Sequence, residues 1–373
     1  MAKVLRRKLT LSIITLVLLI ATFTTATYAW FNILTEASVE NFEFNAHGGD
    51  GFLLSIDNEH WYNRLTTRQM KMAIIQGYDS SRYVIEDEKL YDIAGRKREI
   101  LDDEIDLMLY GNAQNEIDSI ISLSPVTSKD GIEFYSLVNN RIYSNSGNFI
   151  QLNIWFKSTS DNVSDGFISD VYLSGNDVTI QGGTRIPKTT IESNVKVIPL
   201  LDDMTLNDGT IIGPDKDKTH IEVYSSNALR FSIQDTSIET ETPVATIYEI
   251  TNEYDLGSYA TDYDKATDLS SLDEAKKDEL NKLYNADLNP MYTYYNNLRP
   301  NSRLDKMKYE NMPKTIRELT DETIITRVTS GSGGKMLTFR FWLEGWDADC
   351  FDGLSESINV KLLFDSKSVS KNN

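Results

Sequence analysis

The chain has 373 residues, a formal net charge of −19 and one cysteine, Cys350. An acidic surface repels nucleic-acid phosphates and anionic lipid headgroups, so the composition argues against nucleic-acid binding and against electrostatic attachment to membranes. A single cysteine excludes an intramolecular disulfide, so stability must come from a buried apolar core, which a chain of this length can build. We expect Cys350 to be a small buried residue rather than an intermolecular or reactive thiol.

The first 29 residues have the three parts of an export signal. Four basic side chains fall within the first eight positions, residues 9–23 are almost wholly apolar, and Thr27-Tyr28-Ala29 offers small residues where a signal peptidase cleaves. We therefore expect export by the Sec route and a secreted or cell-surface protein that begins at Trp30. The alternative is an uncleaved signal anchor, because residues 9–29 are long enough to cross a bilayer as a helix. The membrane contact would then be confined to that segment.

The residues that follow the export junction form an alternating apolar segment. Its apolar positions are Trp30, Phe31, Ile33, Val39, Phe42 and Phe44. Such a strand at a chain terminus can complete the sheet of a neighbouring subunit, with main-chain hydrogen bonds giving affinity and alternate side chains giving specificity. It can equally pair within its own domain, and the sequence leaves both arrangements open.

Two helical segments are predicted between the first strands. Apolar residues recur at helical spacing near 66–77 and near 98–110. A third helix is expected to begin at Ser271, where Ser271 and Glu274 form a capping-box pattern. It lies in a polar insertion near 254–311, which we expect to be a surface excursion between two core strands.

Short segments in which apolar and polar residues alternate recur through the rest of the chain, separated by Gly-containing turn signals. A strand with one buried and one exposed face gives this pattern. We therefore predict a mainly β fold for residues 30–373, a two-layer antiparallel β-sandwich with helical insertions. Trp155 and Trp342 lie inside two of these segments and are expected in the core. The alternating segments are residues 51–56, 149–156, 169–173, 221–224, 228–233, 337–343 and 358–364.

Four stretches together resemble a family of exported surface proteins. They are residues 26–31 (ATYAWF), 51–57 (GFLLSID) with the following Trp61, 170–173 (DVYL) and 342–350 (WLEGWDADC). They are similar to the TasA and camelysin group of Gram-positive bacteria. The resemblance implies a jelly-roll sandwich and a biofilm-matrix protein that forms fibres by donating its N-terminal strand to the next subunit. This chain departs from TasA in being longer, with the helical and acidic insertions described above.

No catalytic or metal-binding motif accompanies the resemblance. The histidines His47, His60 and His220 are far apart, and the chain has no His-Glu-x-x-His, although camelysin is described as a metalloprotease. No Gly-x-Ser-x-Gly or phosphate-binding loop occurs either. We therefore expect no enzyme and no cofactor. Calcium remains a weaker hypothesis at three acidic stretches, where solvated loops are the simpler interpretation. They are Asp202-Asp203 with Asn207-Asp208, Asp215-x-Asp217, and Asp347-x-Asp349.

Aromatic residues in the polar insertion suggest a second class of function. Tyr292, Tyr294 and Tyr295 form a cluster that is able to stack on a sugar or to contact a protein. The sequence therefore favours a structural or matrix protein that self-associates or binds another surface protein. The alternative is a surface-displayed module that binds glycan or protein.

Overall fold

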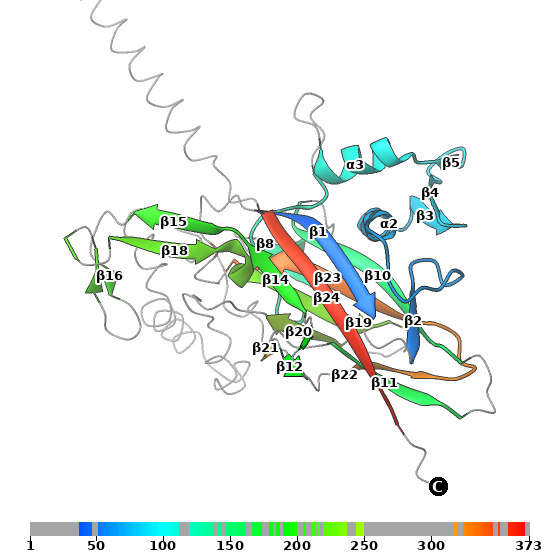
Figure 1. Ribbon diagram of the computed structural model, residues 1–373. Coiled ribbons are helices and arrows are strands. Elements are labelled where there is room, and N and C mark those ends of the chain that lie inside the picture. Colours follow the sequence, from blue (N-terminus) through cyan, green and yellow to red (C-terminus); the bar gives the residue numbers. More distant parts are fainter. Residues whose placement is uncertain are drawn as a thin grey trace, which may run out of the picture.

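The computed structural model describes a mainly β protein built around two large sheets (Figure 1). The described residues are 37–46, 51–111, 119–136, 141–142, 147–160, 166–173, 179–181, 184–186, 189–199, 204–205, 211–213, 215–216, 219–236, 244–249, 316–318, 324–345, 350 and 357–369.

The β1 sheet contains the first and the last strand of the described chain. Its hydrogen-bonded order is β22-β11-β24-β1-β6, with β14 also pairing with β24. All its pairs are antiparallel except β1 with β24, which is parallel. The strands are β1 (Ala37–Ala46), β6 (Ser122–Leu123), β11 (Ile168–Leu173), β14 (Thr190–Ser193), β22 (Ile324–Thr329) and β24 (Ser357–Ser368).

The β10 sheet has the order β2-β10-β23-β19-β20-β21. Only its last pair, β20 with β21, is parallel. Its long strands come from segments in which apolar and polar residues alternate, as one buried face requires. The strands are β2 (Phe52–Ser55), β10 (Phe149–Ser158), β19 (Leu229–Asp235), β20 (Ala245–Glu249), β21 (Ile316–Glu318) and β23 (Lys335–Leu343).

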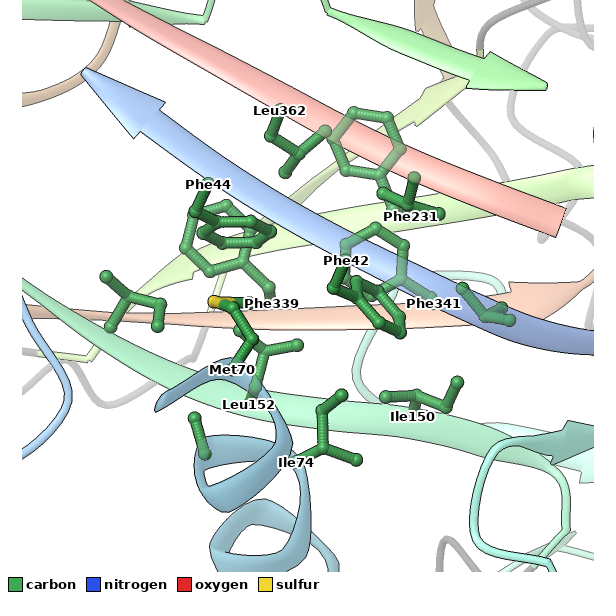
Figure 2. Packing of buried hydrophobic residues seen from close by; sticks show 14 of the residues in the cluster. Phe42, Phe44, Met70, Ile74, Ile150, Leu152, Phe231, Phe339, Phe341 and Leu362 are labelled. Carbon is green, nitrogen blue, oxygen red and sulfur yellow. The ribbon is translucent and has the colours of Figure 1, made fainter. Parts of the chain in front are cut away.

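Residues from the two sheets share one apolar core, shown in Figure 2. Phe42 and Phe44 of β1 meet Phe341 and Phe339 of β23 edge to face, with ring centroids 5.2 Å apart in both pairs. Edge-to-face geometry places the positive rim of one ring on the negative face of the other, which adds to the gain from burial. The inner faces of the two sheets are therefore in direct contact at β1.

Helix α2 (Thr67–Tyr78) closes one side of this core, next to β1 and β10 (Figure 2). Met70 and Ile74 are buried on the side of α2 that faces the core. Thr66 caps the helix: its hydroxyl accepts the backbone N–H of Gln69, and the Gln69 side chain accepts the N–H of Thr66. A Cβ at Gly77 would overlap the main-chain oxygen of Gln151, so glycine allows the last turn of α2 to lie this close to β10.

Helix α3 (Asp102–Tyr110) is shorter than the segment 98–110 predicted from spacing. Arg98–Glu99 instead forms β5, which pairs with β4. The helix begins where Asp102, Asp103 and Glu104 place negative charge at its N-terminus, and the Glu104 carboxylate accepts the backbone N–H of Leu101. That acidic first turn, rather than the apolar spacing, determines the start.

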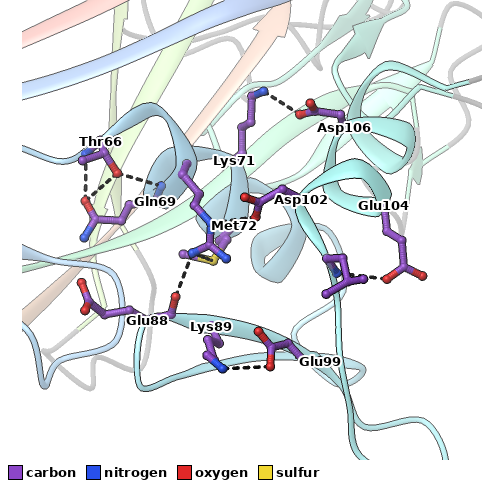
Figure 3. A network of polar contacts seen from close by, with 12 residues as sticks. Thr66, Gln69, Lys71, Met72, Glu88, Lys89, Glu99, Asp102, Glu104 and Asp106 are labelled. Atoms are coloured by element: carbon purple, nitrogen blue, oxygen red, sulfur yellow. Dashed lines mark hydrogen bonds and ion pairs between the residues drawn. The ribbon is translucent and has the colours of Figure 1, made fainter.

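Ion pairs connect the two helices and the small sheet beside them (Figure 3). Lys71 lies 2.6 Å from Asp106, and Arg68 lies 2.8 Å from Asp102. Because these side chains are largely solvent-exposed, each pair contributes at most about 1 kcal/mol. The small sheet is β3 (Tyr83–Glu86), β4 (Lys89–Asp92) and β5 (Arg98–Glu99).

A second small sheet covers part of the outer face of the β10 sheet. Its Phe134 packs on the fully buried Trp342, with ring centroids 5.2 Å apart. This sheet is β7 (Val126–Thr127), β8 (Phe134–Ser136) and β9 (Arg141–Ile142). The remaining elements are the two-stranded sheets β12 (Thr179–Gln181) with β13 (Thr184–Ile186), β15 (Val195–Pro199) with β18 (His220–Tyr224), and β16 (Met204–Thr205) with β17 (Ile211–Ile212), and a 3₁₀ turn η2 (Ser225–Ala228).

Two predicted segments lie outside the described residues: the export signal or anchor at 1–29 and the polar insertion at 254–311. Within the described ranges, the helices are too short or too polar to span a bilayer.

Candidate functional site

The seam between β1 and β24 joins the beginning of the described chain to its end. The two strands run parallel, from Ser38 opposite Ser357 to Ala46 opposite Phe364 (Figure 1). On its other side β24 pairs with β14 and then with β11. Strand β24 is therefore central, and β1 lies between it and the two-residue edge strand β6.

A bulge in β1 places its apolar residues on one face. Val39 pairs with Ile358 and Asn41 with Asn359, so β1 has one extra residue, Glu40, at this point. Without it, Val39 and Phe42 would face opposite sides, because side chains alternate along a strand. The extra residue reverses the alternation and turns both toward the core.

The three apolar side chains of β1 are buried in their own molecule. Val39 is 1% exposed, Phe42 is 5% exposed and Phe44 is 0% exposed. Phe44 contacts Phe339 of the β10 sheet and Phe364 of β24, with ring centroids 5.2 Å and 5.5 Å away. Burying three side chains of this size stabilises the body by several kcal/mol, at about 1.5–3 kcal/mol each. A body without β1 would expose this apolar groove.

The outer edge of β1 is held by few contacts. Its main-chain partners there include Ile121, whose carbonyl accepts the N–H of Val39 at 3.2 Å, and Leu65, whose N–H donates to the Phe44 carbonyl at 3.2 Å. On the solvent side, the Glu43 carboxylate lies 3.6 Å from Arg64 and 3.8 Å from Lys361. Such exposed pairs are weak, so the groove side chains carry most of the energy that holds β1.

The turn that follows β2 contains one of the three histidines. The Asp57 carboxylate accepts the backbone N–H groups of Glu59 and His60, the Ser55 hydroxyl and the His60 ring Nδ1–H. Burial raises the pKa of Asp57, but these hydrogen bonds outweigh it and the pKa falls below its ordinary value. The hydrogen bond to Asp57 raises the pKa of His60. This is a turn held by an Asx-type network.

Most of the other residues singled out by the sequence lie outside the part of the chain that the structure describes. Trp30, Phe31 and Ile33, the tyrosines Tyr292, Tyr294 and Tyr295, and the acidic pairs Asp202-Asp203 and Asp347-x-Asp349 lie outside the described residues. His220 is exposed at the start of β18. Among the residues that the structure describes, no three His, Cys, Asp or Glu side chains gather in a way that would hold a metal ion.

The two strand tryptophans occupy different environments. Trp342 is fully buried under Phe134, and Cys350 is also fully buried. Trp155 is only half-buried and lies on the outer face of the β10 sheet, so its expected place in the core is wrong. It belongs to the polar phase of its strand, since Ile154 and Phe156 on either side are buried. The alternation in the sequence already places Trp155 on the same side as Gln151 and Asn153, whereas the prediction of burial rested on its aromatic character.

Comparisons with known proteins add no relatives. A scan of protein-family models gave no match, and neither the curated proteins nor the solved structures contained one. The similarity to the TasA and camelysin group therefore remains a hypothesis that rests on the four segments quoted above.

Proposed function

We propose that this protein is a secreted or cell-surface structural protein, exported by the Sec route, that assembles into fibres by exchange of β1. In the assembly, β1 of one copy would occupy the groove beside β24 of the next. The jelly-roll arrangement of the two sheets, expected from the resemblance, is part of this proposal. A biofilm matrix is the setting that the same resemblance suggests.

The parallel pairing of β1 with β24 carries the proposal. A strand that enters a sheet through a tight hairpin must pair antiparallel, whereas a strand supplied from elsewhere can be parallel. Strand β1 precedes the rest of the body and is separated from residue 51 by the four residues His47-Gly48-Gly49-Asp50. Exchange of an identical terminal element between copies preserves every buried contact, so it costs little at equilibrium.

A cysteine clamp tests whether β1 must leave its own sheet. Glu43 and Lys361 are register partners on neighbouring strands, and both are partly exposed. We suggest E43C with K361C in a C350A background, in a chain that begins at Trp30. Oxidation of the monomer should lock β1 in place and prevent fibres in electron microscopy, and reductant should restore them. Oxidation after assembly should instead give a ladder of covalent oligomers on a non-reducing gel.

The matched control uses the other neighbour of the same residue. Thr190 of β14 is also a register partner of Lys361, so T190C with K361C forms a clamp that does not touch β1. This control should assemble whether oxidised or reduced. Fibres formed by the oxidised β1 clamp as readily as by the control would refute strand exchange, as would a wild-type chain that stays monomeric under every condition.

A further inference from the structure

The outer face of the β10 sheet carries an array of polar groups beside Trp155. Gln151 pairs in register with Arg340, and Asn153 with Thr338, which in turn pairs with Gln234. These side chains lie opposite the core because their strand neighbours are buried in it. We call Gln151, Asn153, Trp155, Gln234, Thr338 and Arg340 the amide array.

Arg340 lies at the end of the array away from Trp155, and its partners are neutral. Its Nε–H donates to Oε1 of Gln151 at 2.8 Å, and its Nη1–H donates to Oε1 of Gln234 at 2.9 Å. No carboxylate of the described chain lies within ion-pair distance of this guanidinium, whereas Arg327 has a bidentate pair with Asp170. The positive charge of Arg340 is thus fixed in position but not neutralised by a direct partner.

The guanidinium of Arg340 stays charged under physiological conditions. Burial lowers its pKa to about 10, against a smaller opposing effect of the Asp130 carboxylate. At neutral pH the group is therefore still protonated. A half-buried guanidinium without a direct counterion in the described chain favours a ligand that places an anion at this point, even though the net charge of the protein is −19.

The rest of the array offers mainly hydrogen-bond donors. The amide oxygens of Gln151 and Gln234 accept from Arg340, and Oδ1 of Asn153 accepts from the Thr338 hydroxyl at 2.7 Å. Among the described residues, neither the three side-chain NH₂ groups nor Nη2 of the guanidinium has a hydrogen-bond partner. A donor-rich face fits a ligand rich in acceptor oxygens.

Trp155 adds an apolar surface to these donors. It lies four residues from Gln151 along β10, about 13 Å at the rise of a strand. A sugar ring has an apolar face that stacks on an aromatic side chain and a rim of oxygens that accept hydrogen bonds. The separation suits a short oligosaccharide that reaches both Trp155 and Arg340.

We propose that the amide array binds an acidic oligosaccharide, with a sugar carboxylate on Arg340 and a pyranose ring on Trp155. The carboxylate would accept hydrogen bonds from the N–H groups of the guanidinium, and the sugar hydroxyl oxygens would accept hydrogen bonds from the amide NH₂ groups. This inference does not depend on strand exchange, because the array lies on the sheet that does not contain β1.

Isothermal titration of the chain from Trp30 onward with trigalacturonate, and with its neutral methyl ester, tests the site. The wild type should bind the acid more tightly than the ester. R340Q should weaken binding of the acid about tenfold or more and leave the ester unchanged. W155A should lower the affinity for both ligands, since it removes the surface on which the sugar ring stacks.

The matched control is R327Q, which removes an arginine of the β1 sheet that is paired with Asp170. It should leave both affinities unchanged. Should R340Q fail to fold, R340K keeps the charge but lacks the planar fork, and it should reduce the preference for the acid over the ester. Equal binding of acid and ester by the wild type, no binding of either at millimolar concentration, or phosphate binding as tight as trigalacturonate would overturn the proposal.

Discussion

Replacement of Phe44 by alanine should be among the most damaging single changes in the chain. Phe44 is fully buried and has two edge-to-face ring partners, Phe339 and Phe364. Phenylalanine-to-alanine changes in cores lower the free energy of unfolding by about 3–5 kcal/mol. Each edge-to-face aromatic pair contributes roughly 0.5–1.5 kcal/mol beyond the burial of its surface. We therefore expect F44A to lower the free energy of unfolding by about 4 kcal/mol, a large part of the stability of an ordinary domain.

Urea denaturation of the monomer, followed by tryptophan fluorescence, measures this loss. With a urea slope near 3 kcal/mol/M, the midpoint should fall by roughly 1–1.5 M. Phe149 provides the control, because it has one stacked partner, Phe134, and is only half-buried, so F149A should cost roughly 1–2 kcal/mol. A loss below 1 kcal/mol for F44A would mean that β1 does not fill its own groove in solution, and the reasoning about the seam would fail.

Three further changes test other parts of the fold. T66A removes the hydroxyl that caps α2 and should lower stability by about 1 kcal/mol in thermal unfolding, while T66S should restore it. E249A removes the carboxylate that lies 2.9 Å from the fully buried Arg230, and it should cost about 3–5 kcal/mol in urea; a change under 1 kcal/mol would contradict burial of this pair. NMR titration should place the pKa of His60 above its ordinary 6.5 and D57N should bring it back down. Protonated His60 therefore stabilises its turn below pH 6.5, and this contribution is lost as pH rises through the folded-state pKa.

The alternation of apolar and polar residues determines which side chains of each strand face the core, and the sequence predicted several of these strands. Residues 337–343 and 358–364 were expected as strands, and they lie in β23 and β24. At Trp155 the two signals disagree, because periodicity predicts an outward side chain and aromatic character predicts a buried one. Periodicity was the better guide, since a strand that buries Ile154 and Phe156 must turn Trp155 outward.

Strand β1 and the amide array differ in how far the sequence could predict them. Val39, Phe42 and Phe44 were identifiable as apolar positions of one strand, but the bulge that aligns Val39 with Phe42 was not. The array needs three strands in a particular register, and residues more than a hundred positions apart, such as Gln151 and Arg340, share no local signal.

The sequence by itself determined a mainly β protein with an acidic surface, because composition and the two-residue period are properties of single segments. Only the tertiary structure decided that β1 lies parallel to β24 and that Arg340 is held by two glutamines. Strand partners and register depend on contacts summed over the whole core, so they are fixed when the sheets pack and are not encoded in any one stretch of residues.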